Sequence, residues 1–259
     1  QYKLLGFQIR IKPVCFQGKI KLARRPRVLV PNMPVHVVQR GNNRQACFFQ
    51  AKDYAVYLKK LEECAEKFNV RIHCFVLMTN HVHLLLQASD YEGISHVMQS
   101  LGRYYVRYFN TTYNRTGTLC EGRFKSSLVN SEEYLLQVYQ YIELNPVRAK
   151  MVSHPKGYTW SSYHANGGNK NIAMIEPHPL YLSLGVDSVS RKLAYNRLLD
   201  NSLSNETVNK IRISINKSRV LGNDKFVKQI SDQLERFAGY LEHGGDRRSE
   251  EFKEWLQRI

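Results

Sequence analysis

The chain has 259 residues, and its 38 Lys and Arg against 22 Asp and Glu leave a formal net charge of +16. With 43% hydrophobic residues it can bury a core, which excludes a wholly disordered basic tail. No apolar run approaches the roughly 18 residues of a membrane span, so a membrane protein is not expected. The five cysteines lack CxxC spacing, which argues against a disulfide scaffold or a zinc site and favours a cytoplasmic protein. Such a basic chain is expected to bind nucleic acid, because Lys and Arg release counterions from phosphates.

Hydrophobic periodicity and turn residues predict the secondary structure along the chain. A basic extension without acidic residues is expected over 1–22. The elements expected after it are a strand at 35–38, a helix at 53–68, strands at 70–78 and 81–87 that form a hairpin, a helix at 93–109, a strand at 124–129 and a helix at 131–145.

This order of elements indicates an α+β fold, a ferredoxin-like antiparallel sheet with helices on one face. One core domain is expected over 23–165. A linker containing Gly, Asn and Ser is expected over 166–187, and a small helical module that binds DNA over 188–259.

His81 and His83 flank a single apolar residue, Val82, in the second strand of the hairpin. Side chains two apart on a strand share a face, so two imidazoles can converge there on one divalent cation. The alternative is a pair of ordinary strand histidines. The apolar run at 84–86 favours the metal site, because imidazoles in an apolar strand are costly to bury without a partner.

Tyr141 and Asn145 are four residues apart on the last predicted helix and therefore share one face. A phenol and an amide oxygen can approach the same metal there, and the hydroxyl can attack a metal-bound phosphate in line. The alternative for a tyrosine on an amphipathic helix is core packing, which applies equally to Tyr134, Tyr139 and Tyr141. With 16 tyrosines in the chain, chemistry alone does not select the nucleophile.

Four sequence blocks stand in a specific order: NHVH at 80–83, YYVRYFN at 104–110, RTGTLCEGRF at 115–124 and YIELNPVRA at 141–149. Together they resemble the REP-associated tyrosine transposases, chromosomal relatives of the single-tyrosine transposases in the HUH endonuclease superfamily. The HxH element alone is a weak signal, but the four blocks in this order are a strong one. The similarity spans residues 24–163.

The resemblance implies that His81 and His83 ligate Mg²⁺ or Mn²⁺, that Asn145 is a further ligand and that Tyr141 is the nucleophile. Cleavage of single-stranded DNA then joins Tyr141 to a 5′ phosphate and releases a 3′ hydroxyl, and the reverse attack rejoins strands without ATP. Tyr139 is the main rival nucleophile. It lies on a different helical face from Asn145, which argues against it.

Basic residues interleaved with aromatic ones are expected to bind the DNA, because such surfaces pair phosphates with charge and stack bases on rings. The alternative is that the aromatic residues form the inner face of a helix while the arginines are solvated. Family members often carry Trp where this chain has Cys120, so a contact near Arg123 is expected to be weaker. His36, His73 and His96 are expected to be structural. The predicted DNA-binding residues are Arg103, Arg107, Arg115, Arg123 and Lys125.

The sequence therefore predicts a metal-dependent endonuclease and transesterase, a transposase, that cleaves and rejoins DNA at or near palindromic hairpins. Its expected partner is single-stranded or hairpin DNA, with no membrane and no small-molecule substrate. We expect a cytoplasmic, nucleoid-associated protein that is a monomer or a homodimer. The main alternative is a non-catalytic DNA-binding regulator on the same scaffold. A replication or conjugation nickase, which places its histidine pair in a different chain context, ranks lower.

Overall fold

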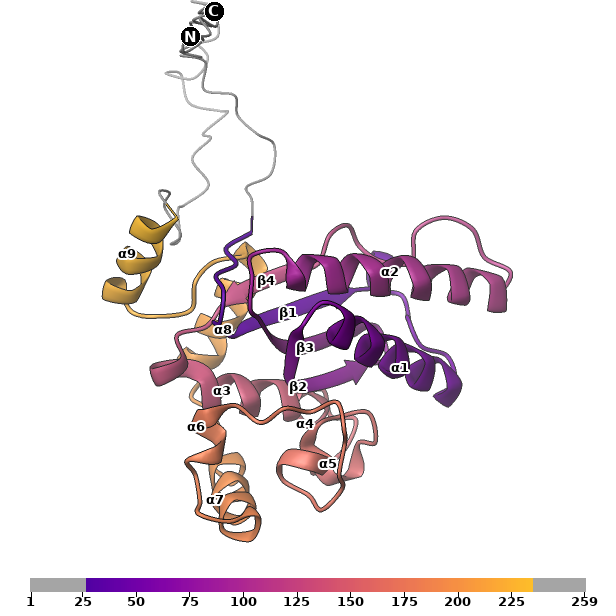
Figure 1. The fold of residues 1–259 in the computed structure, drawn as a ribbon. Helices are drawn as coiled ribbons and strands as arrows, with labels where there is room; N and C mark the ends of the chain where they lie inside the picture. The colour runs from indigo at the N-terminus through magenta and orange to yellow at the C-terminus, as the bar shows by residue number, and fades with distance from the viewer. Residues whose placement is uncertain (1–26, 235–259) are drawn as a thin grey trace, which may run out of the picture.

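The computed structural model describes residues 27–234, which form a sheet covered by helices (Figure 1). The predicted extension at 1–22 and the end of the predicted module, residues 235–259, lie outside the described part of the chain. The strands and helices in chain order are β1 (Val35–Arg40), η1 (Asn42–Arg44), α1 (Ala51–Lys67), β2 (Val70–Met78), β3 (His81–Ala88), α2 (Gly93–Thr112), β4 (Lys125–Leu128), α3 (Ser131–Glu143), α4 (Asn145–Arg148), η2 (Pro155–Gly157), α5 (Tyr163–Asn166), α6 (Pro179–Leu182), α7 (Ser188–Asp200), α8 (Asn205–Lys217) and α9 (Asp224–Gln233).

The sheet has four antiparallel strands in the order β2-β3-β1-β4. β2 and β3 form the predicted hairpin, in which Met78 pairs with His81 across the two turn residues. The chain order βαββαβ with β1 and β3 at the centre is that of a ferredoxin-like sheet. The predicted α+β fold class is therefore confirmed.

α1 begins two residues before its predicted start because of a capping box. The Asp53 carboxylate accepts hydrogen bonds from the backbone N–H groups of Phe49 at 2.8 Å and Gln50 at 3.0 Å. The hydroxyls of Tyr108 and Tyr113, which follow in the sequence on and after α2, donate to the same carboxylate. Burial raises the pKa of Asp53, but these hydrogen bonds outweigh it and lower the pKa overall. One carboxylate thus caps α1 and ties it to α2.

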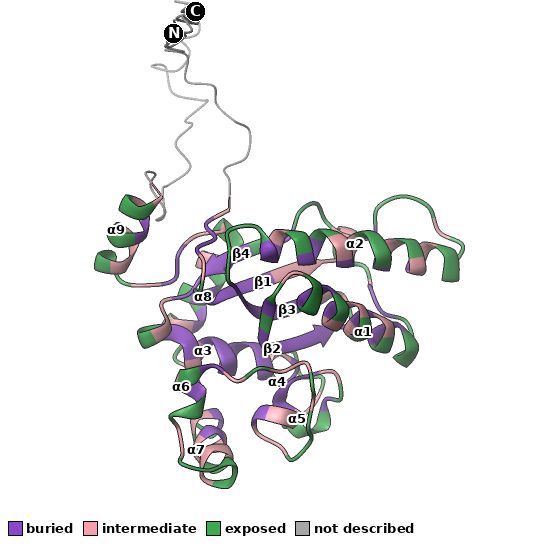
Figure 2. Cartoon of the chain, viewed as in Figure 1, coloured by how far each residue is buried: buried purple, intermediate pink, exposed green. Residues whose placement is uncertain are grey.

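Most residues of the sheet are buried (Figure 2), and strand periodicity places their side chains on its two faces in alternation. Val37, Val82 and Leu84 belong to the core under α1 and α2, the two helices that were expected to cover one face. Val76 and Leu85 belong to a second core, under α3 and the helices that follow it. The sheet is therefore covered on both faces, with α3 opposite the α1–α2 pair, and not by helices on one face only as the sequence predicted.

Residues predicted as linker and C-terminal module contribute to this second core. Tyr181 of the 166–187 segment, Tyr195 of α7 and Ile211 of α8 are buried in the same cluster as Tyr139 of α3. These C-terminal helices thus pack behind the helix that was expected to carry the nucleophile.

Both edges of the sheet are bridged by later segments. Along β2, the Leu77 N–H donates to the Trp160 carbonyl at 2.9 Å, and Ile72 forms an isolated parallel bridge with Ile175. Beyond β4, the Leu221 N–H donates to the Leu128 carbonyl at 2.7 Å. The edge strands are thus paired over part of their length.

Candidate active site

His81 and His83 lie on the α3 face of β3. Val82 between them points to the opposite face, into the core under α1 and α2. The imidazole centroids of the two histidines are 5.0 Å apart, with their planes at 74°. The fold therefore brings the two rings of the HxH pair together.

Each of these rings is held through its Nδ1 atom. Nδ1 of His81 is 2.6 Å from Oδ1 of Asn80, and Nδ1 of His83 is 2.9 Å from Nε2 of His36. No hydrogen bond to Nε2 of His81 or His83 is formed within residues 27–234. The amide oxygen of Asn80 can only accept, so Nδ1 of His81 carries the proton and Nε2 keeps its lone pair, as in metal-binding histidines. In the His83–His36 pair either nitrogen can donate, and metal binding by His83 requires the tautomer in which its Nδ1 is the donor.

His36 of β1 is a site residue that the sequence reasoning missed, since it was expected to be structural. Its ring is fully buried and stacks on His83, with centroids 5.1 Å apart and planes at 23°. Its position across from Leu85 places it diagonal to His83 on the same sheet face. The signal available in the sequence was a histidine flanked on both sides by valines, where a buried imidazole needs a polar partner.

Burial keeps the three imidazoles neutral. It lowers the pKa of His36 to about 3 and of His81 to about 4, and lowers the pKa of His83 well below its ordinary value. The charge of Arg148 lowers the pKa of His36 further, and that of Arg40 acts on His81. Neutral imidazoles beside arginines fit a site for a cation and a phosphate, because the rings offer lone pairs and the guanidiniums supply positive charge.

Tyr141 of α3 completes the cluster from the other side. Its ring meets His83 and His36 edge to face, each at a centroid distance of 5.8 Å. The guanidinium carbon of Arg148 lies 4.3 Å from the centroid of the Tyr141 ring, and Arg148 also donates to the Tyr141 carbonyl. Within the described residues Arg148 forms no ion pair with an acidic side chain. The phenol is thus flanked by two imidazoles and one uncompensated cation.

Tyr139, the rival nucleophile, points away from the histidines. It is fully buried, and its ring stacks on Tyr181 at 5.9 Å with planes 6° apart. Two residues along a helix rotate a side chain by more than half a turn, which separates Tyr139 from Tyr141.

Glu143 anchors the back of α3 and was not singled out from the sequence. Its fully buried carboxyl accepts from Ser162 Oγ at 2.5 Å, Asn166 Nδ2 at 2.8 Å and Tyr195 OH at 2.7 Å. Burial raises its pKa, and the hydrogen bonds counteract part of that rise. The helix that carries Tyr141 is therefore fastened to α5 and α7 through one side chain.

Asn145 does not continue the helix of Tyr141, contrary to the prediction of one helix through 145. α3 ends at Glu143, and Asn145 is the first residue of α4, with Pro146 directly after it. A proline suits the first turn of a helix but not its interior, so the chain restarts rather than continues. No hydrogen bond of the Asn145 side chain to the histidines or to Tyr141 is formed within residues 27–234. Asn145 and Tyr141 therefore do not share one face of a continuous helix, although the sequence predicted this.

The side chains of the site can be compared with those that the implied metal, Mg²⁺ or Mn²⁺, requires. Within the described chain, no group of three or more His, Cys, Asp and Glu side chains has the geometry of a metal site. The two Nε2 atoms of His81 and His83 nevertheless fit, because each ring is neutral and oriented through Nδ1. Any remaining ligands have to be amide, water or phosphate oxygens, which Mg²⁺ and Mn²⁺ prefer.

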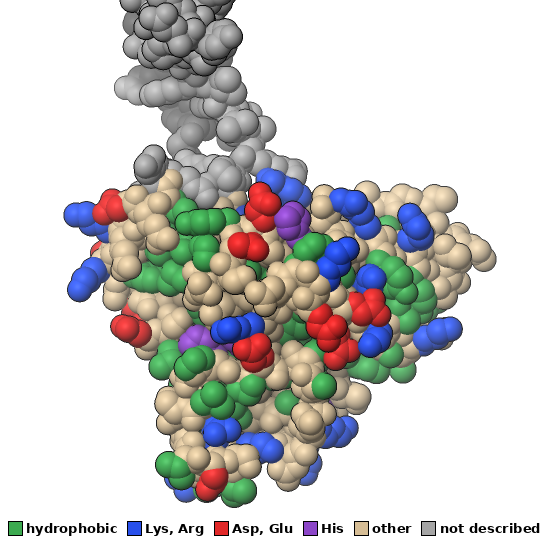
Figure 3. Space-filling view, in the orientation of Figure 1, with side chains coloured by type: hydrophobic (Ala, Val, Ile, Leu, Met, Phe, Trp, Pro, Cys, Tyr) green, Lys and Arg blue, Asp and Glu red, His purple; other side chains and the backbone are tan. Residues whose placement is uncertain are grey.

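The predicted DNA-binding residues lie on several different elements. Arg103 and Arg107 are exposed on α2, over the sheet face opposite Tyr141, whereas Lys125 donates to Asn216 of α8 at 3.2 Å. Arg115 lies 5.5 Å from the Phe109 ring, and Arg123 is exposed in the segment before β4. On the face seen in Figure 3, Lys and Arg side chains are scattered among Asp and Glu.

Of the aromatic residues interleaved with these basic ones, some are packed in the core and some are exposed. Tyr105 and Phe109 are buried in the core under α2. Tyr104 is 46% exposed, with the Lys60 ammonium 4.7 Å from its ring.

No described helix is long and apolar enough to cross a membrane.

Comparisons with known proteins show what this chain is similar to. Among solved structures, the chain is similar to a REP-associated tyrosine transposase bound to a REP hairpin (14% identity, 60% of this chain and 96% of that chain, TM-score 0.43). It is also similar to a transposase from Deinococcus radiodurans R1 (21%, 46% and 95%, 0.34) and to a bacterial tRNA(His) guanylyltransferase-like protein in complex with GTP (15%, 51% and 73%, 0.33). No curated protein matches the chain.

The family model described as "Transposase IS200 like" matches residues 29–145. This stretch contains the whole sheet, both histidines of the HxH pair and Tyr141. Over residues 29–145, which are less than half of the chain, the sequence is therefore similar to the IS200-like transposase family.

Proposed function

We propose that this protein is a transposase, a metal-dependent endonuclease and transesterase that cleaves single-stranded DNA through a tyrosine nucleophile, as in the HUH superfamily. The observation that carries the proposal is the convergence of His81, His83 and Tyr141 from β3 and α3 around one point. A DNA-binding protein without chemistry needs neither the oriented imidazoles nor the phenol beside them.

The two Nε2 atoms of His81 and His83 would hold Mg²⁺ or Mn²⁺, with the Asn145 amide oxygen as a further ligand. When bound, the cation supplies positive charge that polarises the scissile phosphate and stabilises the charge of the transition state. Asn80 and His36 orient the two imidazoles, and mutation of such supporting residues typically weakens metal binding.

The reaction itself falls to Tyr141. Its phenol oxygen attacks the phosphorus, the phenolic proton is released, and a bond forms between that oxygen and the 5′ phosphate. The bond between phosphorus and the 3′ oxygen breaks, and that oxygen leaves as a hydroxyl after taking a proton. The phosphotyrosine conserves the bond energy, so the reverse attack by a 3′ hydroxyl rejoins strands without ATP.

Arg148 is the positioning residue of this scheme. Its guanidinium lies over the Tyr141 ring and has no acidic partner in the described chain, so it can bind a nonbridging phosphate oxygen while fixing the ring. Burial lowers the pKa of Arg148 to about 10, which leaves the group protonated at neutral pH. A fixed cation at this position also stabilises the negative charge that develops on the phosphate oxygens in the transition state.

The substrate we propose is a DNA hairpin with single-stranded flanks, because the four sequence blocks resemble those of the REP-associated transposases. The net charge of +16 supports an anionic polymer as partner. We further propose that the protein acts at the nucleoid as a monomer or a homodimer.

The test is a denaturing gel of the protein incubated with end-labelled hairpin oligonucleotides and Mn²⁺ or Mg²⁺. A slow protein-linked band should form, and it should vanish with a chelator or in Tyr141→Phe. Tyr139→Phe is the matched control, because it removes a buried hydroxyl from the same helix and should leave the band intact. Hairpin binding without any adduct, across metals and hairpins, would favour a non-catalytic regulator instead.

A further inference from the structure

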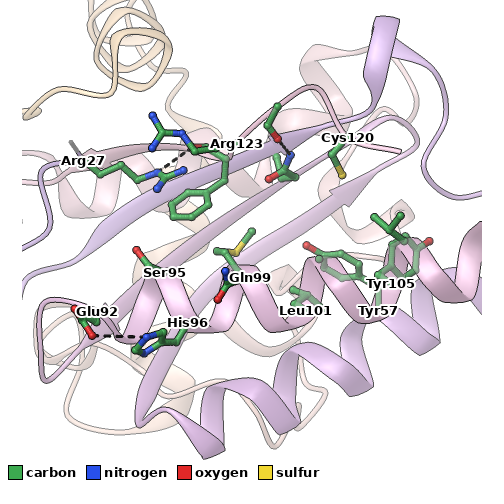
Figure 4. Close-up of a pocket in the computed structure, with 16 residues that line it drawn as sticks. Arg27, Tyr57, Glu92, Ser95, His96, Gln99, Leu101, Tyr105, Cys120 and Arg123 are labelled. Atoms are coloured by element: carbon green, nitrogen blue, oxygen red, sulfur yellow. Dashed lines mark hydrogen bonds and ion pairs between the residues drawn. The ribbon is translucent and has the colours of Figure 1, made fainter. Parts of the chain in front are cut away.

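A cavity of about 550 Å³ lies on the sheet face opposite Tyr141, between α2 and the segment 120–124 that leads into β4 (Figure 4). Its walls include buried Tyr57, Tyr105 and Phe124. In Figure 4, Ser95 and Gln99 point into it from α2. Aromatic walls with a few amide and hydroxyl groups suit a flat ring that carries hydrogen-bonding edges.

The floor of this cavity includes a helix glycine that packing does not explain. A Cβ atom added to Gly102, in the middle of α2, would meet no atom within 4 Å. At Gly93, by contrast, an added Cβ would lie 3.1 Å from Ala88 and Val70, so close packing accounts for that glycine. Glycine in a helix interior lowers the stability of the helix relative to alanine. Its effect at position 102 is to leave open space over α2.

Two arginines lie at one end of the cavity. Arg27 is oriented by the Phe124 ring, 3.7 Å from its guanidinium carbon, and by a 3.2 Å hydrogen bond from Nε to the Phe124 carbonyl. Burial and the neighbouring charge of Arg123 lower the pKa of Arg27 to about 10, which still leaves it protonated. The acidic residue of the cavity, Glu92, is paired with His96 at 3.6 Å and lies apart from the arginines in Figure 4. Paired guanidiniums of like charge are a site for an anion such as a phosphate.

We propose that this cavity is a second DNA-binding site, which takes one unpaired base over Gly102 while Arg27 and Arg123 bind the phosphate attached to it. The inference deepens the proposed function, on which it rests for DNA as the ligand. Aromatic walls alone would suit any flat apolar molecule, but the adjoining arginines select one that carries a phosphate.

The segment that forms one wall of the cavity also adjoins the candidate active site. The Glu121 N–H donates to the Arg40 carbonyl at 2.8 Å, and Arg40 pairs with His81 across β1 and β3. A strand held in the cavity therefore needs to cross only this segment to reach the histidine face. The two sites can then bind different nucleotides of one strand.

The experiment compares two oligomers of equal length and charge, an oligothymidylate and its fully abasic counterpart, by fluorescence anisotropy. It uses the full chain carrying Tyr141→Phe, so that binding is read without cleavage. The abasic oligomer should bind about tenfold more weakly, which measures the contribution of base stacking. Gly102→Leu places a branched side chain in the part of the cavity over the helix, where the base would lie, and should abolish most of that difference, whereas the control Gly102→Ala should keep it.

Arg123→Gln provides a second variant that leaves the cavity open. It should weaken the binding of both oligomers by a similar factor and leave their ratio unchanged, because it removes only a phosphate contact. Unchanged base discrimination in Gly102→Leu would overturn the proposal, as would equal binding of the two oligomers by the Tyr141→Phe protein itself. Failure of the proposed nuclease activity would instead appear in the adduct gel and would leave these ratios untouched.

Discussion

Glu143→Ala should destabilise the protein by about 3 kcal/mol, because it removes the acceptor that several buried donors share. Ser162 Oγ also lies 3.1 Å from the Phe75 carbonyl and can stay paired after the change. Asn166 Nδ2 keeps only a long 3.4 Å contact with the His73 carbonyl, and the Tyr195 hydroxyl loses its acceptor. Two orphaned donors at about 1–3 kcal/mol each, with partial relaxation, give the stated loss.

Glu143→Gln is the matched control, because an amide fits the same hydrogen-bond pattern. Its oxygen can accept from Ser162 and Asn166, and its NH₂ can donate to the Tyr195 hydroxyl oxygen. The two forms should differ in pH dependence. Since burial raises the pKa of Glu143 in the folded state, the wild-type protein is most stable, relative to Glu143→Gln, below the ordinary pKa of 4.5.

As the pH rises above that value, the wild type should lose stability relative to the Gln variant by at most about 1.4 kcal/mol per pH unit. The loss should stop once the pH passes the raised pKa. The ionisable neighbours Cys74 and Tyr195 also have raised pKa values and stay neutral over this range. Urea unfolding followed by circular dichroism across pH measures all three proteins. An Ala variant within about 0.5 kcal/mol of the wild type would refute the reasoning.

His36→Phe keeps a stacked ring but removes the hydrogen-bond partner of Nδ1 of His83, so Mn²⁺ affinity, measured by electron paramagnetic resonance, should fall about 10- to 100-fold. Arg148→Lys keeps the charge but loses the flat stacking on Tyr141; adduct formation should slow about 100-fold with little change in hairpin affinity, and an unchanged rate would exclude its positioning role. Asp53→Asn should cost about 2 kcal/mol in thermal unfolding, because it weakens a cap and two hydroxyl hydrogen bonds. In the wild type this stabilisation is complete above the ordinary pKa of 3.8 and is lost as the pH falls through the lowered pKa, a loss that Asn should not show.

The sheet could be predicted from the sequence because its signals are local. The β-branched run of β1 and the apolar runs around Thr79 and Asn80 give both the strands and the hairpin register. The pairing of His81 with His83 followed from strand periodicity alone. The start of α1 was misplaced by two residues because the prediction followed the apolar periodicity, which begins at Tyr54, and not the capping box of Gln50 and Asp53.

The parts of the site that escaped prediction depend on contacts between distant segments. His36 reaches His83 only through the antiparallel pairing of β1 with β3, whose register one sequence does not display. Glu143 and its donors are up to 52 residues apart. The break before Asn145 was signalled by Pro146, which favours a helix start at the residue before it as well as an end.

The segments that bridge the two edge strands, β2 and β4, affect how two copies of the chain can associate. An exposed edge strand is a template for pairing with another chain, and proteins avoid this by covering it. Here Trp160 and Ile175 bridge β2, and Leu221 bridges the end of β4. Two copies of this chain therefore cannot merge their sheets into one continuous sheet without first displacing these segments. A dimer that leaves them in place would use surfaces other than the bridged stretches of β2 and β4.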